Sequence, residues 1–446
     1  MTYSINDLAT PLPEAVANAI AYGDLSFASS LIASWLSRDG LPSELRHRLE
    51  LEQVLIQRRK NHYIYTPDEA ERLLEKRFPL YRKGMLEAFI RDGLLDWNYV
   101  DGRMMLEATL LDNAAKRCDV LLEGPRVNDE DLQLRDDFIA RLEAEGCVKA
   151  RVSARISLRV PGDGFKGMRA HVNLPLARPV DGRQYDIVVE EATPSPVSID
   201  DETGVMRTAV FEKVLEGDDE FSLAFSYTIE ERLRRRPEKE FVAQGLDKYL
   251  CQQLPHIAFT PYLRSLAGRI TAGKASPWDK AEAIYDWITS HVRYSFVRHY
   301  STIDCVSEYG ALNLKGDCGI QAMLFITMCR IVGIPARWQS GWYVTPKEAG
   351  GHDWAEFNVS GQWYTADCSF GGGAYVQGNE KRRRHYFAGL DTLRMIANCA
   401  CCQPLTGMSG YPRDPSDNQY GEVEVDGHVL VDDLDRRIEV LSYEFI

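Results

Sequence analysis

The chain has 446 residues, of which 45% are hydrophobic and 26% charged, and its formal net charge is −14. This composition is typical of globular proteins and excludes disordered and collagen-like classes, and at about 150 residues per domain the length predicts roughly three domains. The acidic balance argues against nucleic acid or a membrane surface as the main partner.

The ten cysteines and the first residues bear on the compartment. Ten cysteines in this length are far below the density of disulfide-stapled secreted domains. The start of the chain has no basic leader segment, and its apolar run is too short for a signal peptide or a membrane span. We therefore expect a cytoplasmic protein with reduced thiols.

Residues 1–130 carry a helical pattern, with apolar residues at spacings of three and four from Val16 to Lys116. Thr66-Pro67-Asp68-Glu69 forms a capping box that starts one helix. Residues 97–106, around an Asp-Gly turn, predict a hairpin. Helices followed by a hairpin also fit a winged-helix DNA binder, but residues 41–95 contain 11 Lys+Arg against 9 Asp+Glu. An accessory helical domain with an unidentified partner is therefore favoured.

Residues 145–232 change to the period of a β-strand. Apolar and polar residues alternate over 152–160 and again over 221–229, with shorter strands at 186–190 and 206–210 between them. This pattern predicts a small antiparallel β-sandwich without catalytic candidates. The run of mixed charge from Glu230 to Glu240 is read as a solvated linker.

Two capped helices follow. Ser276-Pro277-Trp278-Asp279 opens a helix that ends near His291, and Gly316-Asp317 opens a second that stops at Gly333. The second helix has Cys318 in its first turn. Unpaired amides and the helix dipole favour an anion there, so we expect the pKa of this thiol to fall toward neutrality.

Two strands around Ser360-Gly361 bring the next polar groups together. If these two residues form the loop, Val359 faces Gln362, and His352 and Asp367 become diagonal neighbours about 7 Å apart at Cα. A carboxylate at that place can hold an imidazole in one tautomer. Taken singly, each side chain is as well explained by packing or a turn. Together, Cys318, His352 and Asp367 indicate a thiol nucleophile, its proton carrier and an orienting carboxylate.

These residues stand in motifs that resemble the transglutaminase-like superfamily of papain-type thiol enzymes, in a bacterial-type multidomain arrangement. The motifs are Gly-Asp-Cys318-Gly-Ile-Gln, Val-Gly-Ile-Pro-Ala-Arg337, His352-Asp-Trp-Ala-Glu and Trp-Tyr-Thr-Ala-Asp367. The resemblance covers about 260–375 and implies a papain-like catalytic domain over 255–446 with a C-terminal extension, but it does not reach the region before residue 130. Together with the N-terminal helical domain and the small antiparallel β-sandwich indicated by the periodicity, this predicts an α+β fold.

The resemblance also implies an activity. Cys318 would attack an amide of a protein or peptide and form an acyl intermediate. Mammalian crosslinkers of this family use Ca²⁺, but the sequence has no EF-hand spacing, so we expect no metal or cofactor requirement. The Cys318 amide, and more weakly Tyr294, would stabilise the oxyanion. Hydrolysis is favoured over transamidation, because crosslinking needs a dry acceptor tunnel. Trp338, Trp342 and Trp354 are weak candidates for lining one, although their alternate spacing fits a core. A catalytically silent binding scaffold is the third alternative, and the sequence leaves the substrate and oligomeric state open.

Three features of the tail complete the expectations. Cys399, Cys401 and Cys402 resemble half a zinc site but lack a nearby fourth ligand, so buried thiols are favoured. The basic run from Lys381 to His385 is read as a solvated face, with an approach for acidic substrates as the alternative. Residues 423–431 predict a hairpin that closes the catalytic domain.

Overall fold

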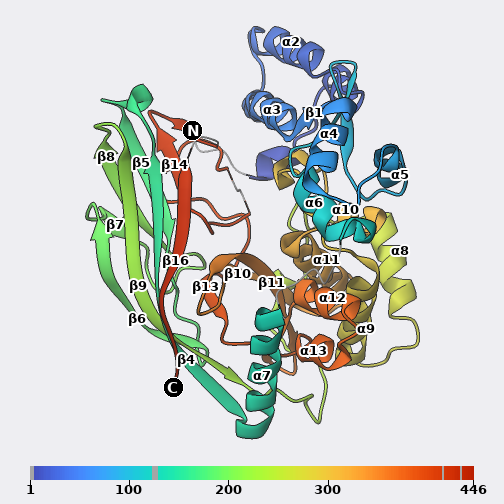
Figure 1. Cartoon of the computed structure of the whole chain (residues 1–446), viewed down its shortest axis with the longest axis vertical. Helices are drawn as coiled ribbons and strands as arrows, with labels where there is room; N and C mark the ends of the chain where they lie inside the picture. Colours follow the sequence, from blue (N-terminus) through green and yellow to red (C-terminus); the bar gives the residue numbers. More distant parts are fainter. Residues whose placement is uncertain (1–4, 123–128, 414–415, 432–433) are drawn as a thin grey trace.

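The computed structural model describes residues 5–122, 129–413, 416–431 and 434–446 (Figure 1). It has an α+β fold in which a curved β-sandwich lies on one side of a mixed helical and β body, and the N-terminal helices lie on top of that body in the view of Figure 1. Within these four ranges, no helix is both long and apolar enough to cross a membrane.

The N-terminal part is mainly helical, with one small antiparallel sheet in the strand order β1-β3-β2. The capping box at Thr66 is present, since its hydroxyl accepts from the Glu69 amide and the Glu69 carboxylate accepts from the Thr66 amide. The predicted hairpin is confirmed as β2–β3, with Val100 opposite Arg103. The elements are η1 (Ile5–Ala9), α1 (Glu14–Ala21), α2 (Leu25–Leu36), α3 (Ser43–His62), β1 (Tyr63–Tyr65), α4 (Pro67–Arg77), α5 (Met85–Arg91), β2 (Trp97–Val100), β3 (Arg103–Glu107), α6 (Leu110–Arg117) and η2 (Asp119–Leu121).

The sandwich consists of two antiparallel sheets, β16-β4-β9-β6 and β15-β14-β5-β8-β7. The alternation in the sequence becomes a buried inner face, in which Ile156 and Phe225 are fully buried. Its elements from the middle of the chain, with the helix that precedes them, are α7 (Asp129–Glu145), β4 (Cys147–Val160), η3 (Asp163–Phe165), β5 (Arg169–Pro175), β6 (Gln184–Thr193), β7 (Ser198–Ile199), β8 (Thr208–Val214) and β9 (Asp219–Arg232).

The C-terminal strands correct one expectation. The hairpin expected at 423–431 does form, as β14 (Glu422–Val425) and β15 (His428–Val429), but it does not close the catalytic region. Instead, β14 pairs with β5, and the last strand, β16 (Asp435–Phe445), pairs with β4 along almost its whole length. The sandwich is therefore built from two segments of chain separated by the catalytic region.

The region between β9 and β14 packs helices against a four-stranded antiparallel sheet of order β12-β11-β10-β13. Helix α11 begins at Cys318 and ends at Ile331, as predicted, and is buried along nearly all its length against β11. The elements are η4 (Asp247–Tyr249), α8 (Pro261–Ile270), α9 (Pro277–His291), η5 (Tyr300–Thr302), α10 (Val306–Asn313), α11 (Cys318–Ile331), β10 (Ala336–Val344), β11 (Ala349–Val359), β12 (Gln362–Ala366), α12 (Cys368–Val376), α13 (Glu380–His385) and β13 (Arg394–Asn398).

Candidate active site

Cys318 occupies the first position of α11, and the helix start is rigidly held. The Asp317 carboxylate caps the helix by accepting from the Ile320 amide at 3.2 Å, and it also accepts from the Tyr300 hydroxyl. The next residue, Gly319, has no room for a side chain. A Cβ there would come within 2.3 Å of the Tyr300 hydroxyl and 2.8 Å of an Asp353 carboxylate oxygen. The start of α11 is thus pressed against β11.

The thiol of Cys318 donates a hydrogen bond to Oδ2 of Asp353 at 3.3 Å. The expected fall in the pKa of this thiol does not occur. Burial raises the pKa of the Cys318 thiol well above its ordinary value, and the negative charges of Asp353 and Asp317 raise it further. A hydrogen bond from the Asp353 main-chain amide acts in the opposite direction but does not prevail. In this arrangement the thiol is protonated.

His352 on β11 and Asp367 at the start of α12 are in direct contact, with 2.8 Å between Nε2 and Oδ2. The register of β11 and β12, with Val359 opposite Gln362, is the predicted one. Asp367 also accepts from the Phe370 amide at 2.9 Å and from the Arg394 guanidinium at 2.9 Å. The Asp367 carboxylate therefore has three donors in a site closed to solvent.

The electrostatics of this pair follow from its burial. Burial would raise the pKa of Asp367, but His352 and Arg394 hold it below its ordinary value. Burial lowers the pKa of His352, and the attraction of Asp367 only partly opposes this. The imidazole is therefore neutral at rest. Because a carboxylate only accepts, Nε2 carries the ring proton, and Nδ1 is left as the basic nitrogen.

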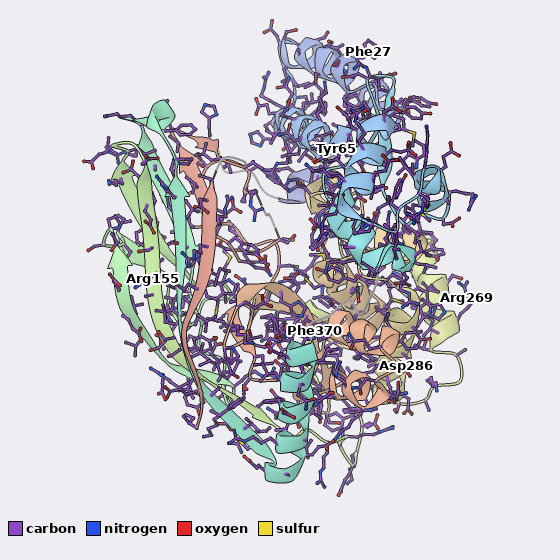
Figure 2. All side chains as sticks on the ribbon, viewed as in Figure 1. Phe27, Tyr65, Arg155, Arg269, Asp286 and Phe370 are labelled. Atoms are coloured by element: carbon purple, nitrogen blue, oxygen red, sulfur yellow. The ribbon has the colours of Figure 1, made fainter. Side chains whose placement is uncertain are left out.

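The imidazole is also fixed by aromatic packing. The Phe370 ring lies 4.5 Å from the His352 ring between centroids, and the Arg394 guanidinium lies 4.4 Å from the Phe370 centroid. Phe370, labelled in Figure 2, also contacts Arg135 of α7 at 4.1 Å. Helix α7 thus helps to hold the histidine, although it precedes the sandwich in the sequence.

The structure brings two of the three predicted catalytic side chains, His352 and Asp367, into hydrogen-bond contact, while the third, Cys318, has a different partner. No hydrogen bond joins Cys318 to His352, both of which lie in the described part of the chain. Instead the thiol bonds Asp353, the residue next to His352 on β11. Tyr294 lies near the thiol: burial raises the pKa of its hydroxyl, and the charge of Cys318 raises it further.

Sequence reasoning missed Asp353, Arg394 and a segment near the C-terminus that lines the site. Gln419 donates to Oδ1 of Asp353 and, at 3.2 Å, to the carbonyl oxygen of His352. The Tyr420 hydroxyl accepts from the Gly351 amide at 2.6 Å. No local spacing links these distant residues to Cys318, but the position of Asp353 directly after His352 was a usable signal.

The three tryptophans proposed to line a substrate tunnel are core residues, so that expectation is wrong. Trp338, Trp342 and Trp354 are at most 2% exposed. Each indole nitrogen already donates inside the protein, and the ring of Trp342 packs on Phe225 of the sandwich. Their alternation along strands reflects burial.

The N-terminal helical part contacts the segment that leads to Cys318. Asn113 of α6 accepts from the Phe296 amide at 2.8 Å and donates to its carbonyl at 3.0 Å. Asp96 lies 3.6 Å from the ammonium of Lys315. Arg58 of α3 donates to carbonyl oxygens of residues 411–413. These helices are therefore packed against both chain segments that approach the thiol.

The basic run at Lys381–His385 is a solvated face only in part, since Lys381 and Arg384 are exposed while the two arginines between them are buried. Arg382 and Arg383 are only 4% and 6% exposed, and the four cations of the run join α13 to α7 and α9. The pairs are Lys381 with Glu143, Arg382 with Asp136, Arg383 with Asp286 and Arg384 with Glu282.

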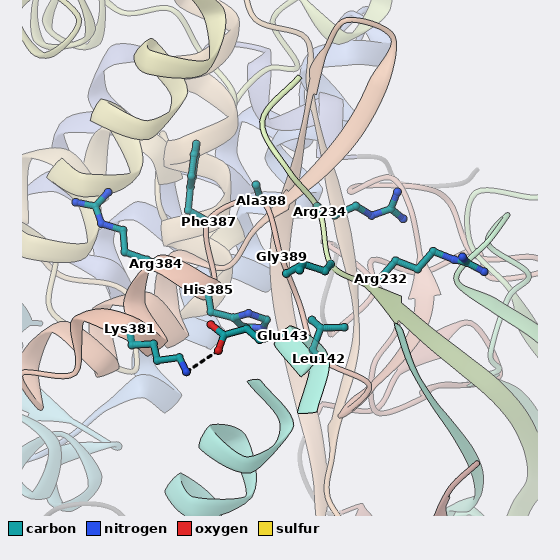
Figure 3. Close-up of a pocket in the computed structure, with 11 residues that line it drawn as sticks. Leu142, Glu143, Arg232, Arg234, Lys381, Arg384, His385, Phe387, Ala388 and Gly389 are labelled. Carbon is teal, nitrogen blue, oxygen red and sulfur yellow. Dashed lines mark hydrogen bonds and ion pairs between the residues drawn. The ribbon is translucent and has the colours of Figure 1, made fainter. Parts of the chain in front are cut away.

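A cavity of about 280 Å³ lies beside the ion pairs between α13 and α7, and Figure 3 shows its lining. It has a cationic lining that includes Arg232, Arg234, Lys381 and Arg384. Lys381 and Arg384 are already ion-paired, and none of the three candidate catalytic residues lines the cavity. It is therefore separate from the site at Cys318.

The cysteines of the tail are free thiols. Arg178 lies 2.7 Å from Sγ of Cys399, and Cys401 is buried. Over the ranges that the structure describes, no group of three or more His, Cys, Asp or Glu side chains is arranged to hold a metal ion.

Comparison with known proteins gives the family of the catalytic region. Residues 264–368 match the family model of the transglutaminase-like superfamily. No curated protein matches the chain. Among solved structures, a "putative cysteine protease" from Cytophaga hutchinsonii is 17% identical and covers 67% of this chain and 93% of its own, with a TM-score of 0.42. The periplasmic domain of TgpA from Pseudomonas aeruginosa is 13% identical, with 55% and 95% covered and a TM-score of 0.29.

The segment 264–368, which contains Cys318, His352 and Asp367, thus belongs to the transglutaminase-like superfamily. This segment is preceded in the chain by a helical N-terminal part and by strands of the β-sandwich.

Proposed function

We propose that this protein cleaves an amide bond of a protein or peptide through an acyl intermediate on Cys318. The observation that carries the proposal is the buried His352–Asp367 pair, 2.8 Å apart, one residue along β11 from the contact of the Cys318 thiol. In this proposal Cys318 is the nucleophile, His352 the proton carrier and Asp367 the orienting group.

The reaction begins with a proton transfer inside the site. The thiol turns from Asp353 toward Nδ1 of His352 and gives it the proton. Asp367 stabilises the imidazolium through its contact with Nε2, and the Arg394 guanidinium and the Phe370 amide hold the Asp367 carboxylate in place by donating to it. The thiolate then attacks the carbonyl carbon, and the Cys318 amide, at the first position of α11, donates to the oxyanion. Tyr294 is the proposed second donor.

Collapse of this intermediate breaks the C–N bond while the imidazolium gives its proton to the leaving amine. Water, deprotonated by His352, then attacks the thioester, releasing a carboxylate and restoring the thiol. Hydrolysis is proposed over transamidation because the aromatic side chains considered for a dry acceptor tunnel are buried in the core.

A peptide-library screen read by mass spectrometry tests this activity on the full chain. We expect cleavage by the wild type, loss of cleavage in Cys318→Ala and His352→Ala, and retention in Cys251→Ala, which removes an exposed cysteine outside the site. Incorporation of a labelled primary amine into a glutamine-containing protein, without cleavage, would show transamidation instead. Equal cleavage in Cys318→Ala and the wild type would refute the proposed nucleophile.

A further inference from the structure

The carboxylate of Asp353 is fixed directly in front of the candidate nucleophile. Its Oδ2 atom lies 3.3 Å from Sγ of Cys318, and its Oδ1 atom accepts from Gln419. Gln419 also donates to the carbonyl of His352 and to the carboxylate of Asp417, each at 3.2 Å. Asp353 is 8% exposed. The Asp353 carboxylate is therefore held firmly within the site. One of its oxygens accepts from Gln419, and the other faces the sulfur.

A second carboxylate reinforces the negative charge at the sulfur. Asp317 caps α11 one residue before Cys318 and is held by the Ile320 amide and the Tyr300 hydroxyl. Burial and, after it, nearby negative charges that include the Cys318 thiolate raise the pKa values of Tyr294, Tyr300 and Tyr420, and the Arg413 guanidinium lies 6.0 Å from the Tyr420 ring centroid. An acyl group bound to Sγ must lie in this negative field.

The position of Asp353 fixes which substrates gain from that field. A group that contacts the sulfur on the side of Asp353 also comes within contact distance of Oδ2, because the two atoms are hydrogen-bonded. In a partly buried site the attraction of a cation to a carboxylate, and the repulsion of an anion, are much stronger than in water.

We propose that Asp353 is a specificity-determining residue that binds an ammonium or guanidinium group carried by the substrate beside the scissile amide. This inference rests on the proposed function and names its substrate class: peptides or proteins with a basic residue next to the cleaved bond. The same contact releases the nucleophile. When the cation occupies Oδ2, the thiol loses its acceptor there and turns to Nδ1 of His352.

Charged thiol reagents test this inference without a known substrate. Cationic trimethylammonium-ethyl and anionic sulfonatoethyl methanethiosulfonates are applied to the full chain, and the labelling rate at each cysteine is followed by mass spectrometry. Both reagents react with the thiolate, so the ratio of their two labelling rates at one cysteine does not depend on the fraction of that cysteine that is deprotonated. We expect the cationic-to-anionic ratio at Cys318 to exceed that at the exposed Cys251 by about tenfold or more.

Asp353→Asn should bring the ratio at Cys318 to within about threefold of that at Cys251, because the amide keeps the shape and an acceptor for Gln419 but removes the charge. Asp353→Ser serves as a second variant if the first is poorly folded by circular dichroism. The matched control is Asp417→Asn, which removes a carboxylate from the same hydrogen-bond chain without touching the sulfur. It should keep the wild-type ratio.

The two proposals fail differently. A ratio at Cys318 that is the same in the wild type and Asp353→Asn, or that favours the anionic reagent, overturns the role of Asp353 even if peptides are cleaved. Absence of cleavage with a high, Asp353-dependent ratio overturns the proposed hydrolysis and leaves the cation site standing. In cleavage assays, peptides with lysine beside the scissile bond should exceed matched glutamate peptides in kcat/KM by about tenfold or more, and Asp353→Asn should remove that preference.

Discussion

Replacing Arg394 by methionine should both destabilise the protein and change the titration of His352. The guanidinium is fully buried, lies 2.9 Å from Oδ2 of Asp367 and 3.5 Å from Asp391, and stacks on Phe370. Methionine fills much of its volume but leaves both carboxylates without this partner. Breaking one side of a buried ion pair costs about 3–5 kcal/mol of unfolding free energy.

The same substitution should move the pH dependence of the site in a defined direction. Burial is the main cause of the lowered pKa of His352, and the positive charge of Arg394 contributes to it. Without that charge the pKa of His352 rises. Since the histidine must be neutral to accept the thiol proton, the acid limb of the pH profile should move to higher pH.

Urea unfolding followed by tryptophan fluorescence measures the first effect, and the alkylation rate of Cys318 by iodoacetamide across pH measures the second. Arg394→Lys is the matched control, because it keeps the charge and loses the planar guanidinium. It should preserve most of the pH profile and lose less stability. An Arg394→Met protein within about 0.5 kcal/mol of the wild type, or with an unmoved acid limb, would refute this account of Asp367 and His352.

Three further outcomes are expected. Burial raises the pKa of Glu107 to about 7 from an ordinary 4.5, so the folded state holds a proton that the unfolded chain releases. Stability should therefore fall by about 3 kcal/mol between pH 4.5 and 7, and urea titrations should show this slope in the wild type but not in Glu107→Gln. Asn113→Ala should strip the Phe296 amide and carbonyl of their partners and cost about 3 kcal/mol, with faster hydrogen exchange at that amide. Gly319→Ala should push the start of α11 away from β11 and lower cleavage at least about tenfold without unfolding the chain; unchanged kcat/KM would contradict the tight packing.

The parts of the fold that follow from local chemistry could be predicted. The capping boxes and the Asp-Gly and Ser-Gly turns fix short-range geometry, so the start of α11 and the register of β11 with β12 agree with the expectation. The contact between His352 and Asp367 follows from that register. Roles in catalysis, the domain boundaries and the cytoplasmic location stay predictions.

The rest depends on contacts between distant segments. The pKa of Cys318 was expected to fall because its place on the helix is visible in the sequence, while the approach of the Asp353 carboxylate requires β11 to pack on α11. Likewise, nothing near residue 423 indicates that its strand pairs with β5. The three tryptophans show the same limit of sequence analysis. An alternating pattern of apolar residues indicates that one face of a strand is buried, but it does not say which face.

The return of the chain to the sandwich has a consequence for the order of folding. Both sheets begin with strands between Cys147 and Arg232, but β4 and β5 acquire their outer partners only from residues 422–445. During synthesis these two strands are left with unpaired edges while nearly 200 residues of the catalytic region are made between them and their partners. The helices and sheet around Cys318 can therefore fold on a sandwich that is still open, and residues 422–445, which are translated later, close it. A fragment ending before residue 422 would keep every candidate catalytic side chain but expose two sheet edges, and we expect such a fragment to aggregate.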